Sequence, residues 1–360
     1  MKILFVTEFF PDAKKVFTGG VEARTWFTVD YLRRRHSVRV ISRRTALVAA
    51  SLGSGWSRMW FMVRAVIEGW RGLKADVVEG SNVICYLPAW LTAKIKGVAV
   101  VAWVPDILGS DWRHFGWLTG SLGWSLEWLS FKLPWDQVIA LSQQTKKKLV
   151  ARGVNPERIS VIYPGIDQDE FTIPGKKRAG ATICMIARLV PYKRVADGVK
   201  SAAELKSELA GLKLLVIGAG PEKRRLMKLA QNLGVAGRIY WKSRLPRTSL
   251  VQALKSCQVL CHLSMVEGFG LVMLEAVAAG LPYVAYDTPI NQEVTYGGEG
   301  GVLVPVGNWR RAAAAVKLLL TDQQFYRQKA AEGKKLLKNY SWAEAARRTE
   351  AVYESLVPSV

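Results

Sequence analysis

Short apolar runs alternate along this chain with segments in which apolar residues recur every three or four positions. Continuous apolar runs are typical of strands buried on both faces of a parallel sheet, and the longer spacing is typical of amphipathic helices. Residues 2–7 form such a run, residues 21–35 have helical spacing after a Gly-Gly turn, and residues 38–42 form a second run. Strand, glycine-rich turn, helix and strand in this order predict the start of a doubly wound α/β domain.

The alternation continues in two series that are separated by a polar stretch at residues 164–180. The first series adds predicted strands at 76–79, 98–104, 137–142 and 160–163, and a helix at 145–152. The second series has predicted strands at 182–187, 213–217, 238–241, 257–263 and 283–286, with helices at 194–208, 221–233 and 270–279. We therefore predict an α/β fold with two Rossmann-like doubly wound domains, at 1–165 and 166–340, and a C-terminal helix at 341–360.

Composition adds a strong positive charge to this picture. The 360 residues are half hydrophobic, which is enough for two cores, and the formal net charge is +22. Such an excess predicts a polyanionic partner: nucleic acid, an anionic membrane or phosphorylated ligands. An ordinary soluble protein rich in lysine would have the same charge. We expect no nucleic-acid partner, because the chain has neither a recognised binding motif nor a single basic stripe.

Four cysteines, Cys85, Cys184, Cys257 and Cys261, lie in apolar segments without a CxxC pair. Reduced, buried thiols are the expected state, which favours a cytoplasmic protein. Cys257, Cys261 and His262 have the residue types of a metal site. Their apolar neighbours indicate a buried strand instead, so we predict no metal.

The apolar N-terminus is too short for a signal peptide and runs directly into polar sequence. No stretch of about 20 uncharged apolar residues occurs, so we expect no transmembrane helix.

Two tryptophan-rich segments have helical spacing. The first comprises Trp56, Trp60, Val63, Ile67 and Trp70, interspersed with Arg58, Arg64, Arg71 and Lys74. The second comprises Trp117, Trp124, Trp128, Phe131 and Trp135. Amphipathic helices with tryptophan on one side and basic residues on the other suit a membrane interface. The same stripes also suit helices that pack on a sheet. With the net charge, they lead us to favour a protein peripheral to the cytoplasmic face of an anionic membrane.

The segment most informative about chemistry runs from Glu267 to Glu275. Its glycine-rich turn opens a helix, so the backbone N–H groups of Phe269, Gly270 and Leu271 can approach an anion there. Glu267 can accept hydrogen bonds from sugar hydroxyls, and Glu275 can reach a ribose. The alternative is a glycine-rich connector with two incidental acids.

Basic and glycine-rich loops follow other predicted strands. Arg188 and Lys193 follow the first strand of the second series, and ligands of open α/β sheets bind just beyond the carboxyl ends of strands. Two cations there would neutralise a diphosphate leaving group. Gly218 belongs to a Gly-x-Gly turn that is too short for a dinucleotide fingerprint. Gly19 and Gly20 open the first helix and are a second anion-compatible turn.

Taken together, these motifs resemble those of glycosyltransferase family 4, a group of retaining GT-B hexosyltransferases. The resemblance spans nearly the whole chain and rests on the E-x7-E pair Glu267 and Glu275, the Arg-Leu-x-x-x-Lys signature Arg188 to Lys193, the helix start Gly19-Gly20, the element Pro164-Gly165-Ile166-Asp167, and Ser341-Trp342. It implies two domains with an interdomain cleft, and a last helix that crosses back to the first domain.

The resemblance also implies roles for individual residues. Arg188 and Lys193 would hold the donor diphosphate, Glu267 the donor sugar and Glu275 the ribose. Further donor contacts would come from Gly19, Gly20, Gly218, Arg244, Leu245, Phe269, Gly270 and Leu271. The donor would be a UDP-sugar or GDP-sugar, with no metal required. Cations and helix-end N–H groups would stabilise the departing diphosphate, and a front-face mechanism needs no general base. The acceptor would be a lipid or lipid-linked glycan bound by the N-terminal domain.

The chain departs from the family pattern at several positions. Glycine is missing before Arg188 and after Lys193, where Ala187 and Arg194 stand. Many members have Val-His-Asp where this chain has Val104-Pro105-Asp106, so Pro105 replaces a histidine that touches the donor sugar. Asp106 and His114 are the nearby candidates for the acceptor side. A non-enzymatic sugar-nucleotide-binding subunit is the alternative that this replacement leaves open.

Overall fold

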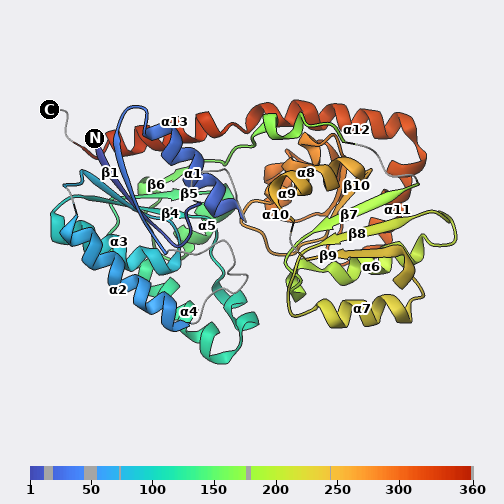
Figure 1. Cartoon of the computed structure of the whole chain (residues 1–360), viewed down its shortest axis with the longest axis horizontal. Coiled ribbons are helices and arrows are strands. Elements are labelled where there is room, and N and C mark those ends of the chain that lie inside the picture. The colour runs from blue at the N-terminus through green and yellow to red at the C-terminus, as the bar shows by residue number, and fades with distance from the viewer. Residues whose placement is uncertain (12–18, 44–54, 73, 176–179, 244, 358–360) are drawn as a thin grey trace. The chain divides into compact units, whose positions relative to one another are not determined.

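The computed structural model describes residues 1–11, 19–43, 55–72, 74–175, 180–243 and 245–357 (Figure 1). The chain divides into two compact units. The N-terminal unit comprises Met1–Gly165 together with Trp342–Val360, and the C-terminal unit comprises Ile166–Ser341. Each unit is a parallel sheet covered by helices.

The sheet of the N-terminal unit has six parallel strands in the order β2-β1-β3-β4-β5-β6. Their bounds are β1 (Lys2–Thr7), β2 (Ser37–Ser42), β3 (Val77–Gly80), β4 (Ala99–Val104), β5 (Gln137–Ala140) and β6 (Ile159–Val161). Every side chain of β1 after Lys2 is buried. Such a continuous apolar strand is stable in water only when helices cover both faces of the sheet.

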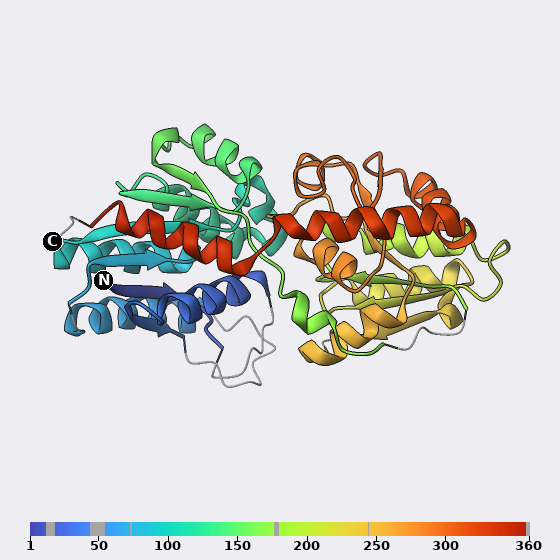
Figure 2. The same ribbon diagram turned by 90° about the horizontal axis from the view of Figure 1, so that it is seen from above.

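Helices lie on both faces of this sheet. They are α1 (Gly20–Leu32), α2 (Gly55–Arg71), α3 (Val83–Lys96), α4 (Trp117–Ser130), α5 (Gln143–Ala151) and α13 (Trp342–Glu354), with 3-10 turns η1 (Gly109–Phe115) and η2 (Pro156–Arg158). Helices α2 and α3 cover one face, and α1 and α13 lie side by side on the other (Figures 1 and 2). Within the described parts of the chain, no helix combines the length and the apolar composition needed to cross a bilayer.

The last helix is fastened to the N-terminal unit by buried polar contacts. Glu79 of β3 accepts hydrogen bonds from Nη2 of Arg24 at 2.9 Å and from the Tyr353 hydroxyl at 2.5 Å. The ring of Phe27 on α1 stacks on Trp342, with centroids 5.0 Å apart. Since Arg24 lies on α1 and Tyr353 on α13, one carboxylate joins two helices to the sheet.

The C-terminal unit repeats the architecture with strand order β12-β11-β10-β7-β8-β9, all parallel. The strands are β7 (Thr182–Ile186), β8 (Lys213–Ile217), β9 (Ile239–Lys242), β10 (Val259–His262), β11 (Tyr283–Tyr286) and β12 (Gly301–Val304). The helices are α6 (Val195–Glu204), α7 (Lys223–Asn232), α8 (Arg247–Ser256), α9 (Leu271–Ala278), α10 (Pro289–Val294), α11 (Trp309–Thr321) and α12 (Gln323–Leu336), with 3-10 turns η3 (Gln168–Phe171), η4 (Pro191–Lys193), η5 (Ala236–Arg238) and η6 (Leu337–Asn339).

The fold class is as predicted, but several element bounds are not. The helix expected at 194–208 ends at Glu204, and the strand expected at 257–263 is shortened to Val259–His262. The sequence did not predict α3, α8, α10, α11 or the edge strand β12. That strand begins at Gly301, where a Cβ would lie 2.4 Å from the carbonyl oxygen of Tyr283. Its glycine is required by close packing, whereas in sequence it resembles part of a turn.

Candidate active site

The loop after β7 carries the first pair of predicted site residues. Arg188 is exposed, and its Nη2 donates to the hydroxyl of Tyr192 at 2.7 Å. Lys193 ends the 3-10 turn η4, which starts at Pro191. Both cations therefore lie at the carboxyl end of β7, where an open α/β sheet binds ligands.

Two glycines in the loop after β8 fix the position of the loop that carries Arg188. A Cβ at Gly218 would lie 1.8 Å from the carbonyl oxygen of Ala187, and one at Gly220 would lie 2.3 Å from that of Leu189. The backbone N–H of Leu189 also donates to the carbonyl of Ala219 at 2.9 Å. The Gly-x-Gly turn therefore permits backbone-to-backbone packing that places the Arg188 loop.

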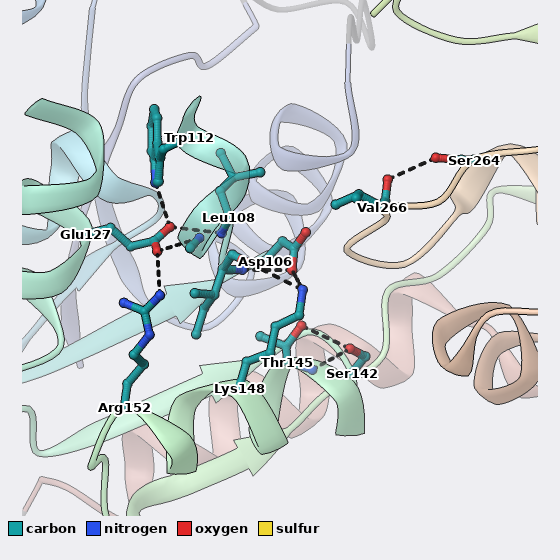
Figure 3. Close-up of polar contacts among 12 residues, drawn as sticks. Asp106, Leu108, Trp112, Glu127, Ser142, Thr145, Lys148, Arg152, Ser264 and Val266 are labelled. Carbon is teal, nitrogen blue, oxygen red and sulfur yellow. Dashed lines mark hydrogen bonds and ion pairs between the residues drawn. The ribbon is translucent and has the colours of Figure 1, made fainter. Parts of the chain in front are cut away.

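Lys193 and Glu267 form the centre of the site. Nζ of Lys193 lies 2.6 Å from Oε1 of Glu267 and donates to the carbonyl of Val266 at 3.2 Å. Nε2 of His262, at the end of β10, lies 3.1 Å from the same carboxylate oxygen. The turn between them is closed by Ser264, which donates to the carbonyl of Val266 at 2.9 Å (Figure 3).

The surroundings of Glu267 favour its charged form. Burial would raise the pKa of this carboxyl, but the Lys193 ammonium and the His262 imidazole outweigh burial and hold the pKa well below its usual range. The carboxylate is therefore an anion at neutral pH. It can accept hydrogen bonds from hydroxyl groups and cannot serve as an acid.

The glycine-rich turn leads into α9 as predicted. Gly270 has φ of +88°, which favours glycine, and Leu271 is the first residue of the helix. Oδ1 of buried Asn291 has no hydrogen-bond partner among the described residues and lies 3.8 Å from where a Cβ of Gly270 would stand. The helix N-terminus supplies unpaired N–H groups and a positive dipole end, which favour an anion.

Glu275 lies one turn into α9 and is paired with Arg247. Nη1 of Arg247, the first residue of α8, donates to Oε1 of Glu275, and its Nε donates to Oε2 of Glu170 at 2.7 Å. The motif predicts that Glu275 binds a ribose, but nothing in the sequence predicts its pairing with this guanidinium.

The remaining predicted donor residues differ in their burial and in their contacts. A side chain at Gly218 would clash with the backbone of Ala187. The N–H of Gly218 donates to the carbonyl of Lys242 at the end of β9, which places Gly218 next to the segment that contains Leu245. Leu245 is half-buried. Phe269 is buried, and its ring packs edge-on against Tyr340. Arg244 lies outside the described residues.

Three residues of this site were missed by sequence reasoning: His262, Arg247 and Asn291. His262 was assigned to a buried strand, which is correct, yet its imidazole faces Glu267 at the strand end. A histidine at the carboxyl end of a predicted parallel strand was the available signal. Nothing in the sequence marked Arg247 or Asn291 among so many basic and polar residues.

The N-terminal unit contains the second glycine pair. Gly19 is the N-cap of α1 and Gly20 its first residue, and a Cβ at Gly19 would meet no atom of the described residues within 4 Å. Both glycines are exposed. Within the described part of the chain, no side chain therefore covers the N-terminal end of α1, where helix N–H groups lack intrahelical partners.

The loop after β4 is organised by two carboxylates (Figure 3). Asp106 accepts from Nζ of Lys148 on α5 at 2.7 Å. Buried Glu127 of α4 accepts from the backbone N–H groups of Leu108 and Gly109, both at 2.9 Å, and from Nε1 of Trp112 at 3.0 Å. Asp106 thus lies beside a cation next to Pro105, whereas the side chain of His114 lies outside the described residues.

Helix α2 presents its tryptophans outward. Its buried residues Phe61, Ala65 and Gly69 are spaced by four and face α3, where a Cβ at Gly69 would touch Thr92 at 2.6 Å. The outward residues Trp56, Trp60, Val63, Ile67 and Trp70 are 40% to 73% exposed. The helix therefore has an apolar stripe on each side.

Helix α4 also presents its large apolar residues outward, and it buries small or polar residues instead. Its buried positions are small or polar: Gly120, Gly123, Glu127 and Ser130. Its outward positions Trp117, Leu118, Leu122, Trp124, Trp128 and Leu129 are 45% to 87% exposed. The last two residues of the second predicted stripe behave differently, because Phe131 and Trp135 pack in the core. These two residues therefore follow the alternative of packing on the sheet, and the membrane interpretation does not hold for them.

The cysteines are all free and buried. Burial raises the pKa of the Cys261 thiol to about 12, so it is protonated at neutral pH.

Two family models match almost the whole chain between them. Residues 18–170 match the glycosyltransferase family 4 model, and residues 167–336 match the model of glycosyl transferases group 1. Among curated relatives, an exopolysaccharide phosphotransferase of Streptomyces coelicolor is 33% identical over 55% of this chain and 21% of that protein. Glycogen synthase of Mycobacterium tuberculosis is 27% identical over 79% of this chain and 69% of that protein. The chain thus spans from about a fifth to about two thirds of the length of these relatives.

Solved structures show the same architecture. The Anabaena protein HepE, crystallised with UDP and glucose, has a TM-score of 0.79 at 18% identity, covering 99% of this chain and 100% of that one. One assignment follows from three observations: family models that match both halves, the E-x7-E segment after β10, and two six-stranded parallel sheets. The chain belongs to glycosyltransferase family 4 and has the GT-B fold.

Proposed function

We propose that this chain transfers a glycosyl group from a nucleoside-diphosphate sugar to an acceptor, with retention of anomeric configuration. The observation that supports this most is the cluster at the carboxyl edge of the C-terminal sheet. Lys193, Glu267 and His262 converge within 3.1 Å contacts there, directly before the N-terminus of α9. HepE has been crystallised with UDP and with UDP-glucose, which suits such a donor.

The cations would stabilise the departing diphosphate. An ammonium has three N–H donors, and the bonds of Lys193 to Glu267 and Val266 use two of them. The third can point to a phosphate oxygen. Arg188 is exposed and supplies a planar fork that suits phosphate. The N–H groups at the start of α9 add a positive potential, so charge that develops on the leaving group meets preoriented donors.

Glu267 would orient the donor sugar. Its carboxylate stays ionised, so it can accept hydroxyl hydrogens and stabilise the positive charge that develops at the anomeric carbon. In a front-face reaction the leaving phosphate oxygen takes the acceptor proton, and the new bond forms on the face that the leaving group departs from. No protein base is then required for this step.

The N-terminal unit would receive the acceptor. The N-terminus of α1, at exposed Gly19 and Gly20, suits a phosphate or sugar oxygen. Asp106, held by Lys148, offers a carboxylate at the end of β4. A paired acid and base at that strand end suit a hydroxyl-rich acceptor.

Thermal denaturation with a panel of nucleotide sugars tests the donor site. A ligand that binds the folded state raises the melting temperature, and saturation at about 100 times Kd adds roughly 2.7 kcal/mol of stability. We expect one UDP-sugar or GDP-sugar to stabilise the wild type but not Lys193→Ala. Lys213→Ala, at the opposite end of the neighbouring strand β8, is the matched control and should respond like the wild type. A shift that is equal in all three proteins would contradict the site.

The acceptor is proposed to lie at a membrane surface. Helices α2 and α4 both pack on α3, and both expose tryptophans instead of burying them. Exposed Arg71, Lys74, Arg113 and Lys132 lie at or next to these helices. Outward tryptophan with nearby basic groups suits anionic lipid headgroups, and the net charge of +22 acts in the same direction.

Flotation with vesicles of phosphatidylcholine and phosphatidylglycerol tests this surface. We expect the wild type to float at low salt and the triple change of Trp117, Trp124 and Trp128 to serine to remain with the soluble fraction. Met227→Ser with Leu318→Ser, two exposed apolar residues of the C-terminal unit, is the matched control. Flotation of the tryptophan variant at the wild-type level would overturn the membrane proposal.

A further inference from the structure

Glu275 does not stand alone on α9. Arg247 donates Nη1 to Oε1 of Glu275 and Nε to Oε2 of Glu170, which lies in η3. The side chains of all three residues are less than a fifth exposed. The guanidinium also lies over the ring of Phe171, 5.5 Å from its centroid. One arginine therefore ties two carboxylates from different elements.

Stability alone is a weak explanation for this arrangement. The cost of removing charges from water largely cancels the attraction between them, so partly buried ion pairs contribute little net stability. Two carboxylates share one guanidinium here, which leaves a net negative charge at the site. What the arrangement does provide is a fixed orientation, because a planar guanidinium bonded through two nitrogens cannot rotate freely.

Among the described residues, the bonding pattern leaves part of Glu275 available. A carboxylate has about four lone-pair sites, and the bond from Arg247 engages Oε1. The remaining lone pairs can accept hydrogen bonds from a vicinal diol. A carboxylate that is held on one side and open on the other is oriented before the ligand arrives, which lowers the entropic cost of binding.

We propose that Arg247 is a positioning residue that holds Glu275 for the ribose hydroxyls of the nucleotide. This inference rests on the proposed donor site. Arg247 touches the carboxylate and not the sugar, so it acts through Glu275. Removal of the Arg247 guanidinium leaves Glu275 in place but allows its carboxylate to rotate and to bind water.

The contrast between ribose and deoxyribose reports on this role. A site built to bond a hydroxyl rejects the analogue that lacks it, because the acceptor is then left unpaired. The ratio of the Kd of 2′-deoxy-UDP to that of UDP therefore measures how well Glu275 is oriented. Loss of general stability would weaken both nucleotides alike and leave the ratio unchanged.

The experiment is calorimetric titration of the full chain with UDP and 2′-deoxy-UDP, and with GDP and 2′-deoxy-GDP. We expect the wild type to prefer the ribonucleotide by roughly tenfold or more, as for a hydrogen bond to a charged group. Glu275→Gln and Arg247→Gln should each bring the ratio close to one, and the double variant should show no additional loss. Arg225→Gln removes the ion pair between exposed Arg225 of α7 and Glu222, the N-cap of that helix, and should keep the wild-type ratio.

The outcomes distinguish failure of the positioning role of Arg247 from failure of the proposed donor site. If Arg247→Gln binds both nucleotides with the wild-type ratio while Glu275→Gln loses it, the positioning role is overturned and the donor site stands. If the wild type binds neither UDP nor GDP, the proposed function fails and this inference fails with it. Arg247→Lys keeps the charge without the planar fork. If the glutamine variant does not fold, an unchanged ratio in the lysine variant overturns the inference.

Discussion

Arg194 follows Lys193 directly and has a backbone conformation that residues with side chains rarely adopt. Its φ is +50°, in the left-handed region, where the Cβ costs about 1–2 kcal/mol. Its Nε donates to buried Asp197 at 2.7 Å, and Asp197 also accepts from the hydroxyl of Tyr286 at 2.6 Å. The ion pair offsets strain at the residue that fixes the position of Lys193, a combination expected near a functional site.

Replacement of Arg194 separates the strain from the ion pair. Both Arg194→Ala and Arg194→Gly lose the ion pair, but only alanine keeps the Cβ. We expect the alanine variant to be less stable than the glycine variant by about 1 kcal/mol, measured by urea denaturation. A glycine variant that is no more stable than the alanine variant would show that the backbone relaxes and that no strain is held there.

The charge of Glu267 gives stability a defined pH dependence. Its pKa lies below the ordinary value of 4.5 in the folded chain, so the unfolded chain takes up the proton first. Its contribution to the free energy of unfolding is complete above the unfolded pKa and is lost as the pH falls towards the folded pKa. The slope is about 1.4 kcal/mol for each pH unit between the two values.

Unfolding of the wild type and Glu267→Gln from pH 7 to pH 3 measures this term. We expect the difference between their unfolding free energies to be constant above about pH 5.5 and to change in favour of the glutamine variant below about pH 4.5. A constant difference down to pH 3 would mean that Lys193 and His262 do not stabilise the anion.

For individual residues of the site, the sequence pointed to Lys193 and Glu267 but not to the side chains that contact them. Spacing and position after strands pointed to Lys193 and Glu267, and the structure brings them within 2.6 Å. His262 and Arg247 come to the site from a buried strand and from the start of α8. Their contacts depend on tertiary packing, which local periodicity does not encode.

Helix α4 shows what the pattern of one element can and cannot predict. Helical spacing of tryptophan predicted the helix, but the same spacing suited a core-facing or an outward stripe. Packing decides the direction, because Gly123 lies against the ring of Trp112, where a Cβ would come within 2.3 Å. The small residues are required on the inner face, so the tryptophans face outward.

Substitutions on the two faces of α4 should therefore differ sharply. Gly123→Ala should destabilise the fold by about 1–3 kcal/mol, because the added methyl overpacks the contact with Trp112. Leu122→Ala, one residue away and 59% exposed, should change stability by less than about 0.5 kcal/mol. Thermal melts of both variants measure the difference. Equal effects would indicate that α4 is oriented differently.

For the whole molecule, alternation of strands and helices was sufficient to predict two doubly wound units and the fold class. The polar stretch at 164–180 predicted where one unit ends. Strand order and the edge strand β12 were beyond reach, because pairing partners in a parallel sheet are distant in sequence and Gly301 has no apolar side chain to mark a strand. The buried pair of Glu79 and Tyr353 that fastens α13 to β3 was likewise not visible in the sequence.

The proposed transfer from an activated sugar depends on the cluster of Lys193 and Glu267. It is measured by the release of nucleoside diphosphate from the full chain, supplied with the nucleotide sugar that stabilises it and with membrane lipid extract as acceptor. We predict release by the wild type and by Lys213→Ala, and a loss of roughly 100-fold or more in Lys193→Ala, the usual effect of removing one preoriented electrostatic contact. Wild-type turnover in folded Lys193→Ala would show that this cluster does not support the reaction.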